Sequence, residues 1–422
     1  MMKVYKAIRG NMRSHSFTIG GVLLLAAAQV VLASSHPAAT TGEMVAADRP
    51  PTATPAEMRE AGLLVGNTTP FGPTDGILRY DGLGAFIDKM IPVPDSISGL
   101  QIPCCLTFGP DENLYVSSPL SSSGVLRFNG VTGAFMDTFI PGGSGGLGLP
   151  LILLFHEGYL YVGDTGAGAI RRYDAKTGAY VDNFIPDNSE GMGTPFDLQH
   201  FAFGPDQDRP FPGGAGAVRP RRDHGATGDH LEGQDQGLPS AGREHSEGPY
   251  KDLYVAAEIS KRVLRYDGQT GAFIEDLVPS DAGFSPSGLT FGPDELLYVG
   301  SAASGEVRRY DVRTGTYEVF IPAGGRLSTP VGIAFGPDGN FYAAAVGTSE
   351  ILRYDGRTGR FLGALVPSGR GGITAPRVIT WKAKTKVCHQ PGGNTAKGRT
   401  LTIGYLSALD HLRHGDTLGS CE

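Results

Sequence analysis

The chain is poor in several features that define other classes of protein. Its 422 residues include one tryptophan and four cysteines, and the net charge is only −7 with no long basic stretch. This charge gives little electrostatic support for binding nucleic acid, so we expect no nucleic-acid partner. Beyond the N-terminal region no apolar run approaches the roughly 20 residues that span a bilayer, so we expect no transmembrane segment in the mature chain. Sixty-three glycines and thirty prolines instead predict many tight turns between short elements.

Residues 1–33 are typical of a secretory signal peptide. Four basic residues precede an apolar run at 19–32, and a small-residue cleavage signal ends at Ala33. The run is short for a membrane span, and the alternative is a retained short anchor. Residues 34–62, rich in Ala, Thr and Pro, are expected to form a flexible linker. The sequence therefore predicts a secreted protein, periplasmic or extracellular.

A repeat of about 44 to 48 residues organises most of the remaining chain. It follows the tetrad Leu-Arg-Tyr-Asp and its variants, whose aromatic positions are Tyr80, Phe128, Tyr173, Tyr266, Tyr310 and Tyr354. Each copy contains four β-prone runs, which we call strands A to D, as at 288–291, 297–299, 307–310 and 317–321. Phe-Gly-Pro-Asp turns follow strand A, and Asp-Gly-x-Thr-Gly turns follow strand C. Four antiparallel strands at this period predict the blade of an all-β propeller.

The ends of the array predict that it closes into a ring. The first copy has only strands B, C and D, whereas residues 377–381 form a lone strand A. Joined, they complete one blade and remove an open sheet edge, which would otherwise invite aggregation. We therefore expect a β-propeller over residues 63–381, closed by N- and C-terminal strands that share one blade.

The number of blades depends on residues 208–247. The gap between Tyr173 and Tyr266 is 93 residues, about twice the others, and 208–247 shows no clear strands. This stretch is a degenerate seventh blade, a disordered insertion into a six-bladed ring, or sequence read out of frame. The long gap favours seven blades with one degenerate.

Two motifs of the repeat match known propellers. They are Phe-Gly-Pro-Asp-Gly-Asn-Phe-Tyr at 335–342, and Leu-Tyr-Val-Gly-Asp-Thr-Gly at 160–166 ahead of Ile-Arg-Arg-Tyr at 170–173. On these residues the chain resembles the NHL-repeat propellers and, more loosely, the gluconolactonase-like and streptogramin-lyase-like propellers. The motifs build turns and cores, so the resemblance indicates architecture and not activity.

The resemblance to gluconolactonase-like propellers implies a divalent cation, Ca²⁺ or another, held on the ring axis by acidic and amide side chains. The matching positions that offer oxygen ligands are Asn67, Asp164 and Asp197. The alternative is that Asp164 and Asp197 bond their own loops. Arg377, which opens the last strand, is a further ligand-binding candidate.

The B–C and D–A connections vary between copies, and propeller connectivity places them on one face, which we call the variable-loop face. We favour an exported, monomeric, non-enzymatic scaffold that binds a protein, glycan or small molecule there. The alternative is a divalent-metal-dependent hydrolase or lyase of the gluconolactonase-like or streptogramin-lyase-like type. A lyase of that type would need a histidine base, and for the available His156 and His200 a structural role is favoured.

Residues 382–422 are expected to form a small separate module. Cys388 and Cys421 should pair in an oxidising compartment and close a loop too small to be held by burial alone. The module's candidate metal ligands are His389, His411, His414 and Asp416, the alternative being solvated polar side chains. Its Cys-His…His-Gly-Asp…Cys pattern resembles a short segment at the C-termini of secreted bacterial proteins.

The other two cysteines, Cys104 and Cys105, are adjacent and lie just ahead of a strand A. They form either a strained vicinal disulfide, which would mark a functional position, or two small buried residues.

Overall fold

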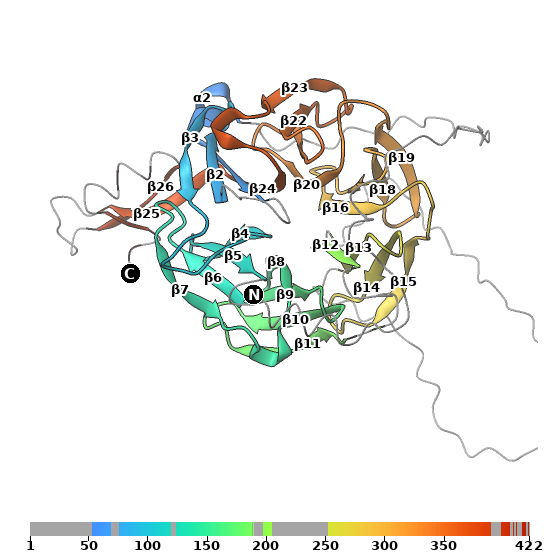
Figure 1. Ribbon diagram of the computed structural model, residues 1–422, viewed down its shortest axis with the longest axis horizontal. Helices are drawn as coiled ribbons and strands as arrows, with labels where there is room; N and C mark the ends of the chain where they lie inside the picture. The colour runs from blue at the N-terminus through green and yellow to red at the C-terminus, as the bar shows by residue number, and fades with distance from the viewer. Residues whose placement is uncertain are drawn as a thin grey trace, which may run out of the picture. The chain divides into compact units, whose positions relative to one another are not determined.

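The structure is a computed structural model that describes residues 53–68, 76–119, 124–187, 189, 197–204, 252–389, 398–405, 408, 411, 416–418 and 421. Within this part of the chain, six sheets of four antiparallel strands surround a common axis (Figure 1). The innermost strand of each sheet contacts that of the next, from the first sheet round to the sixth and back. The all-β propeller expected from the repeat is therefore confirmed.

Every blade runs outward from an inner strand A to an outer strand D. The first comprises β24 (Pro376–Lys382), β1 (Gly62–Asn67), β2 (Gly76–Asp81) and β3 (Phe86–Ile91), and the second β4 (Leu106–Phe108), β5 (Leu114–Ser118), β6 (Gly124–Phe128) and β7 (Phe135–Ile140). The third comprises β8 (Pro150–His156), β9 (Tyr159–Asp164), β10 (Ala169–Asp174) and β11 (Tyr180–Ile185), and the fourth β12 (Leu198–Phe203), β13 (Leu253–Ala257), β14 (Arg262–Tyr266) and β15 (Phe273–Val278). The fifth comprises β16 (Pro286–Phe291), β17 (Leu297–Ser301), β18 (Val307–Asp311) and β19 (Thr316–Ile321), and the sixth β20 (Pro330–Phe335), β21 (Phe341–Ala345), β22 (Glu350–Tyr354) and β23 (Phe361–Val366).

The first blade closes the ring as the sequence predicted. Its inner strand, β24, comes from the end of the array and pairs with β1 in the register Leu63↔Trp381 and Val65↔Ile379. All six residues of β1 are buried. The sheet edge that β1 would otherwise present is therefore covered by the last strand of the propeller.

The fourth blade decides the number of blades. Its inner strand β12 pairs directly with β13, with Phe203 opposite Leu253. The residues between these two partners therefore connect strands A and B of one blade, and the closed ring has no place for another. The favoured count of seven blades is wrong, and the six-bladed alternative is confirmed, because the inner strands of the described residues close into a ring of six. The expected degenerate segment, 208–247, lies outside the described residues.

The recurring aromatic residue of each copy is a core residue of its blade. The six side chains at Tyr80, Phe128, Tyr173, Tyr266, Tyr310 and Tyr354 are all buried. Each contacts an aromatic side chain at the start of strand D, as in the pair Tyr266 and Phe273, whose ring centroids are 5.6 Å apart. Five of these ring pairs are edge-to-face and one, Tyr310–Tyr317, is tilted, and all of them fasten the outer strand to the blade.

The arginine that precedes the aromatic residue pairs with a carboxylate on strand D in five blades. The pairs are Arg79–Asp88, Arg127–Asp137, Arg172–Asp182, Arg265–Glu275 and Arg309–Glu318. In the sixth blade Arg353 lies opposite Gly363 instead. The repeat therefore encodes cross-strand ion pairs as well as packing.

Two elements outside the blades border the ring. A short helix, α2 (Pro55–Glu60), begins with a capping box between Thr54 and Glu57 and buries Met58. The last residues of the segment expected as a linker, 34–62, are therefore helix and the start of a strand. Residues 1–52, including the expected signal peptide at 1–33, lie outside the described part of the chain. No helix among the described residues has the length and hydropathy needed to cross a bilayer.

The C-terminal residues form a three-stranded sheet of β25 (Lys384–His389), β26 (Arg399–Gly404) and β27 (Thr417–Leu418), in the order β26-β25-β27. Figure 1 labels β25 and β26. Tyr405 anchors it to the second blade, because its buried ring lies edge-on to Phe108 and its hydroxyl donates to the carbonyl of Gly130 at 2.7 Å. Glu112 adds a hydrogen bond from Thr385 at 2.9 Å and an ion pair with Lys382. The sheet therefore rests on the side of the ring.

Candidate functional site: an axial pocket

A cavity of about 420 Å³ lies between the inner strands. Its walls come from the first residues of β8, β12, β20 and β24 and from the residues just before β4. Thr68 and Pro119, which directly follow β1 and β5, complete it. Because the A strands begin and the B strands end there, the cavity lies at the variable-loop face. We call it the axial pocket.

The wall of the axial pocket is mostly apolar. The apolar side chains are Ile102, Leu149, Leu151, Ile152, Val331, Ile333, Val378 and Ile379. The polar contributions come mainly from Thr68, Cys104, Gln199, His200 and Arg377. Cavities of this size, apolar with a few convergent polar groups, are typical of sites for small ligands.

Arg377, a ligand-binding candidate from the sequence, supplies the one cationic side chain among the described residues that line the pocket. The guanidinium charge acts to lower the pKa of two side chains from other blades, Cys104 and Glu258. Burial raises the pKa of the Cys104 thiol to about 12 and also raises the pKa of the Glu258 carboxyl, while the Arg377 charge opposes both shifts. A positive charge in apolar surroundings attracts an anionic group more strongly than it would in water.

Cys104 and Cys105 are both free thiols in the structure, so no vicinal disulfide is formed. Cys105 is buried, and burial raises its pKa to about 11. Both thiols are protonated at neutral pH, and a protonated thiol is a poor nucleophile. They therefore act as small packing residues, and Cys104 presents a neutral surface to the pocket.

His200, on β12, lines the pocket and has an unusual electrostatic environment. Its Nδ1 atom is buried with no hydrogen-bond partner among the described residues. Burial lowers the pKa of this histidine to about 4, so the ring is neutral at physiological pH. The neutral ring offers the pocket a hydrogen-bonding group without a charge.

We expect acid to destabilise the protein through His200. In the unfolded chain its pKa returns to about 6.5, so between pH 7 and pH 4 the unfolded state takes up a proton that the folded state excludes. The free energy of unfolding should fall by up to about 3 kcal/mol by pH 4, with no loss from this group above pH 7. Urea unfolding at both pH values should show a smaller loss for His200→Gln than for wild type or for His156→Gln. Equal losses in all three proteins would contradict this assignment.

Asn67 and Asp164, predicted as axial ligands, instead hold the loops that enter their own blades. The Asn67 side chain accepts hydrogen bonds from the backbone N–H groups of Thr374 and Ala375 at 3.0 and 2.8 Å. Asp164 accepts from those of Gly148 and Leu149, both at 2.9 Å. Neither residue lines the axial pocket. Both are buried at the end of strand B, where the D–A loop brings N–H groups that need acceptors.

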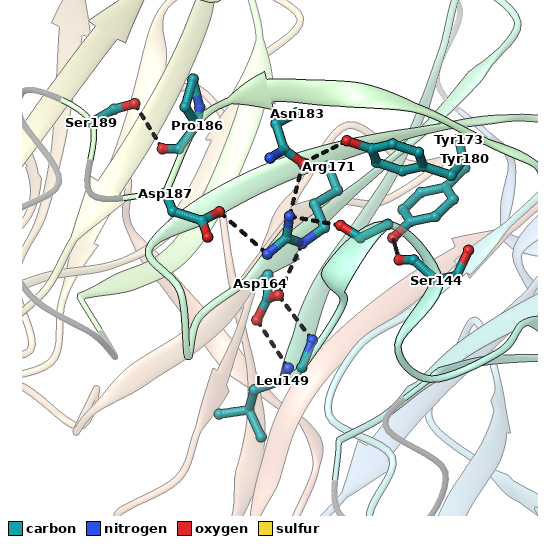
Figure 2. Close-up of polar contacts among 12 residues, drawn as sticks. Ser144, Leu149, Asp164, Arg171, Tyr173, Tyr180, Asn183, Pro186, Asp187 and Ser189 are labelled. Atoms are coloured by element: carbon teal, nitrogen blue, oxygen red, sulfur yellow. Dashed lines mark hydrogen bonds and ion pairs between the residues drawn. The ribbon is translucent and has the colours of Figure 1, made fainter.

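The carboxylate of Asp164 also binds Arg171, as Figure 2 shows, with 3.0 Å between Oδ2 and Nε. The two side chains are only 1% and 4% exposed. Arg171 donates further to the Gly145 carbonyl at 3.0 Å and to the Asn183 side chain at 2.8 Å (Figure 2). This network satisfies a buried ion pair on both sides and fixes the third blade's D–A loop.

Asp197 lies just before β12 and is buried. One carboxylate oxygen accepts hydrogen bonds from the backbone N–H groups of Ile259 and Ser260 at 2.8 and 2.9 Å. The other oxygen, Oδ2, has no hydrogen-bond partner among the described residues. The alternative that Asp197 bonds its own loop therefore explains the contacts of one carboxylate oxygen and not of the other.

The candidate metal ligands of the C-terminal sheet come together. His389, His411 and Asp416 have ligand atoms within 4.8 Å of one another, and among the described residues no other three His, Cys, Asp or Glu side chains gather in this way. Cys388 and Cys421 form a disulfide beside them. His414 lies outside the described residues.

Comparisons with known proteins identify the architecture. No protein-family description matches the chain, and no curated protein matches it. Among solved structures, the nidogen/laminin complex contains a chain with a TM-score of 0.51 and 14% identity, over 76% of this protein and 98% of that chain. A protein from Bacteroides fragilis solved as a candidate 6-phosphogluconolactonase gives 0.48 and 15%, over 78% and 99%. A streptogramin B lyase gives 0.43 and 14%, over 74% and 76%. At these identities the likeness concerns the fold alone: the chain is similar to β-propellers, among which both binding proteins and enzymes occur.

Proposed function

We propose that this protein is an exported binding propeller whose axial pocket takes a small molecule with an apolar body and a carboxylate or similar anionic group. The observation that carries the proposal is Arg377, the one cationic side chain among the described residues that line a mostly apolar wall at the variable-loop face. The apolar side chains would bury the body of the ligand, and the guanidinium would pair with its carboxylate. Export is supported by the Cys388–Cys421 disulfide, a bond typical of oxidising compartments.

The chemistry of the pocket favours binding over catalysis. The His200 ring, with a pKa near 4, is a weak base, and the Cys104 thiol, with a pKa near 12, is a weak nucleophile. The oxygen atoms of Asn67 and Asp164 are engaged with backbone N–H groups of the loops. A calcium-like cation needs several oxygen ligands that converge on one point, and these two side chains do not supply them.

A lyase is the second candidate function, and one observation favours it. His200 lines the pocket, and its Nδ1 has no hydrogen-bond partner among the described residues, so the ring carries a nitrogen not engaged by the protein. Loss of turnover of a bound ligand in His200→Gln, with its affinity unchanged, would favour the lyase over the binding protein.

The proposal is tested with a carboxylate and its neutral amide. We expect 4-phenylbutyrate to bind the purified protein in calorimetry more tightly than 4-phenylbutanamide does. Arg377→Gln should weaken carboxylate binding about 10- to 100-fold, because a hydrogen bond to a charged partner contributes about 1.5–3 kcal/mol. Binding of the amide should change little, and the preference for the carboxylate should disappear.

Arg360→Ala is the matched control, because this exposed arginine does not line the pocket. It should bind both probes as wild type does. Equal affinity of wild type for the two probes, or of Arg377→Gln and wild type for the carboxylate, would overturn the proposed role of Arg377. Absence of binding by a panel of aryl and alkyl carboxylates would overturn the ligand class.

A further inference from the structure

Two imidazoles converge on one buried carboxylate in the C-terminal sheet. The Nδ1 atoms of His389 and His411 lie 2.8 and 2.7 Å from the same oxygen, Oδ2 of Asp416. The Asp416 side chain is 3% exposed, whereas the two histidine side chains are 34% and 30% exposed. The carboxylate is thus fixed inside the module, and each imidazole has one side open to solvent.

Three separate constraints hold these residues together. Strand β25 pairs with β27 so that Cys388 lies opposite Thr417, which makes His389 and Asp416 cross-strand neighbours. The Cys388–Cys421 disulfide ties the residue beside His389 to the end of the chain. The backbone N–H of Asp416 donates to the carbonyl of His411 at 3.2 Å, which places the second imidazole. The cluster is therefore positioned by the module's own framework.

We propose that His389, His411 and Asp416 bind a divalent transition metal ion, with Zn²⁺ as the best match. Two imidazole nitrogens and one carboxylate oxygen form a common three-residue zinc set, which leaves a fourth position for water. In a tetrahedral site with metal–ligand distances of about 2.0–2.1 Å, neighbouring ligand atoms lie about 3.3 Å apart. The N–O distances of 2.7 and 2.8 Å therefore need to open by about half an ångström, and all three ligand atoms already lie within 4.8 Å of one another. The two imidazole rings are part-exposed and have room to turn, whereas the Asp416 carboxylate is buried.

The site is independent of the axial pocket, since it lies in the sheet that borders the outside of the second blade. The disulfide withholds Cys388 from the metal, so the donor set is nitrogen and oxygen, not sulfur. The ion would bridge β25, β27 and the segment that carries His411. We therefore expect metal binding to stabilise the C-terminal sheet.

The test is a titration of the metal-free, full-length protein under non-reducing conditions, with Zn²⁺ followed by calorimetry and Co²⁺ by its visible spectrum. We expect one equivalent of Zn²⁺ to bind and Co²⁺ to give the intense bands of a four-coordinate site. His411→Gln and Asp416→Asn should each weaken Zn²⁺ binding at least about tenfold and remove those bands, because each takes away one of three ligands. Thermal melting of the metal-free variants shows whether each variant still folds.

Two controls separate this site from other histidines. His156→Gln, which changes a histidine stacked on Phe203 in the ring, should bind metal as wild type does. A variant with His224, His230 and His245 changed to alanine should keep the same one-equivalent site; these three lie outside the described residues. The proposal is overturned if wild type binds no Zn²⁺, or if folded His411→Gln and Asp416→Asn both bind it as tightly as wild type. Loss of binding in the triple variant alone would also overturn it.

Discussion

Deleting residues 376–422 is expected to abolish cooperative folding of the propeller. The deletion removes β24, so β1 loses its inner hydrogen-bonding partner along Gly62–Asn67, although every residue of that strand is buried in the intact ring. The first blade then has an exposed sheet edge at β1, and the space that β24 occupies beside the axis is left empty. This loss should exceed the 5–15 kcal/mol that stabilises a typical domain. Circular dichroism and calorimetry should show no sharp unfolding transition.

The matched control deletes only residues 383–422 and keeps β24. All six blades remain complete in this variant, so we expect a cooperative transition. Its midpoint should be lower than that of the full chain, because the contacts of Tyr405 with Phe108 and Gly130 are lost. Similar transitions in the two truncated proteins would mean that β24 does not close the ring.

The second large effect is expected for Asp164→Ala. Removing this carboxylate leaves the Arg171 guanidinium, 4% exposed, without its buried partner, and leaves the N–H groups of Gly148 and Leu149 without an acceptor. Half-exposed Asp187, 3.3 Å from Arg171, remains as a carboxylate partner of the guanidinium. Breaking a buried ion pair by removing one partner costs about 3–5 kcal/mol. Urea unfolding should show a loss of this size with an unchanged m value.

Asp182→Ala is the control within the same blade. Asp182 also pairs with an arginine, Arg172, but its side chain is 43% exposed. Exposed pairs contribute about 1 kcal/mol or less. If Asp164→Ala lowers the free energy of unfolding no more than Asp182→Ala does, the Arg171 network does not stabilise the blade as its geometry indicates.

The architecture could be predicted from the sequence because its determinants are local and repeated. Tyr266 and its counterparts recur since each blade needs the same buried ring against the start of strand D. The lone strand at 377–381 could be matched to the incomplete first copy by counting strands. These features depend on a few residues at fixed spacing, which a single sequence displays.

The expected seventh blade is not observed because the 93-residue interval between Tyr173 and Tyr266 measures chain length, and chain length does not count blades. Residues 203–206 read Phe-Gly-Pro-Asp, the turn that ends strand A in other copies, and Leu253 then begins a strand B. The extra residues thus fall inside one A–B connection, where they can lengthen the chain without adding a blade. The turn at 203–206 is therefore a better guide to the blade count than the spacing of 93 residues.

The site residues were harder to predict, because residue type does not reveal which neighbour a side chain meets. Asn67 and Asp164 carry suitable oxygen atoms, yet the D–A loops supply backbone N–H groups that bind those atoms first. The pocket wall is drawn instead from the opening residues of the inner strands, including Gln199 and His200. Nothing in the local sequence distinguishes an inner-strand residue that faces the axis from one that faces the next blade.

The way the ring closes also determines how it would respond to mechanical force. Gly62 and Lys382 are paired at the same end of the antiparallel β1–β24 ladder. A force applied at these two residues would break the hydrogen bonds of the ladder one after another in an unzipping geometry, and not all at once in a shearing geometry. The C-terminal sheet protects this point, because the Tyr405 ring lies so close over Gly62 that a side chain there would collide with it. The small sheet beside the propeller therefore covers the end of the strand pair that closes the ring.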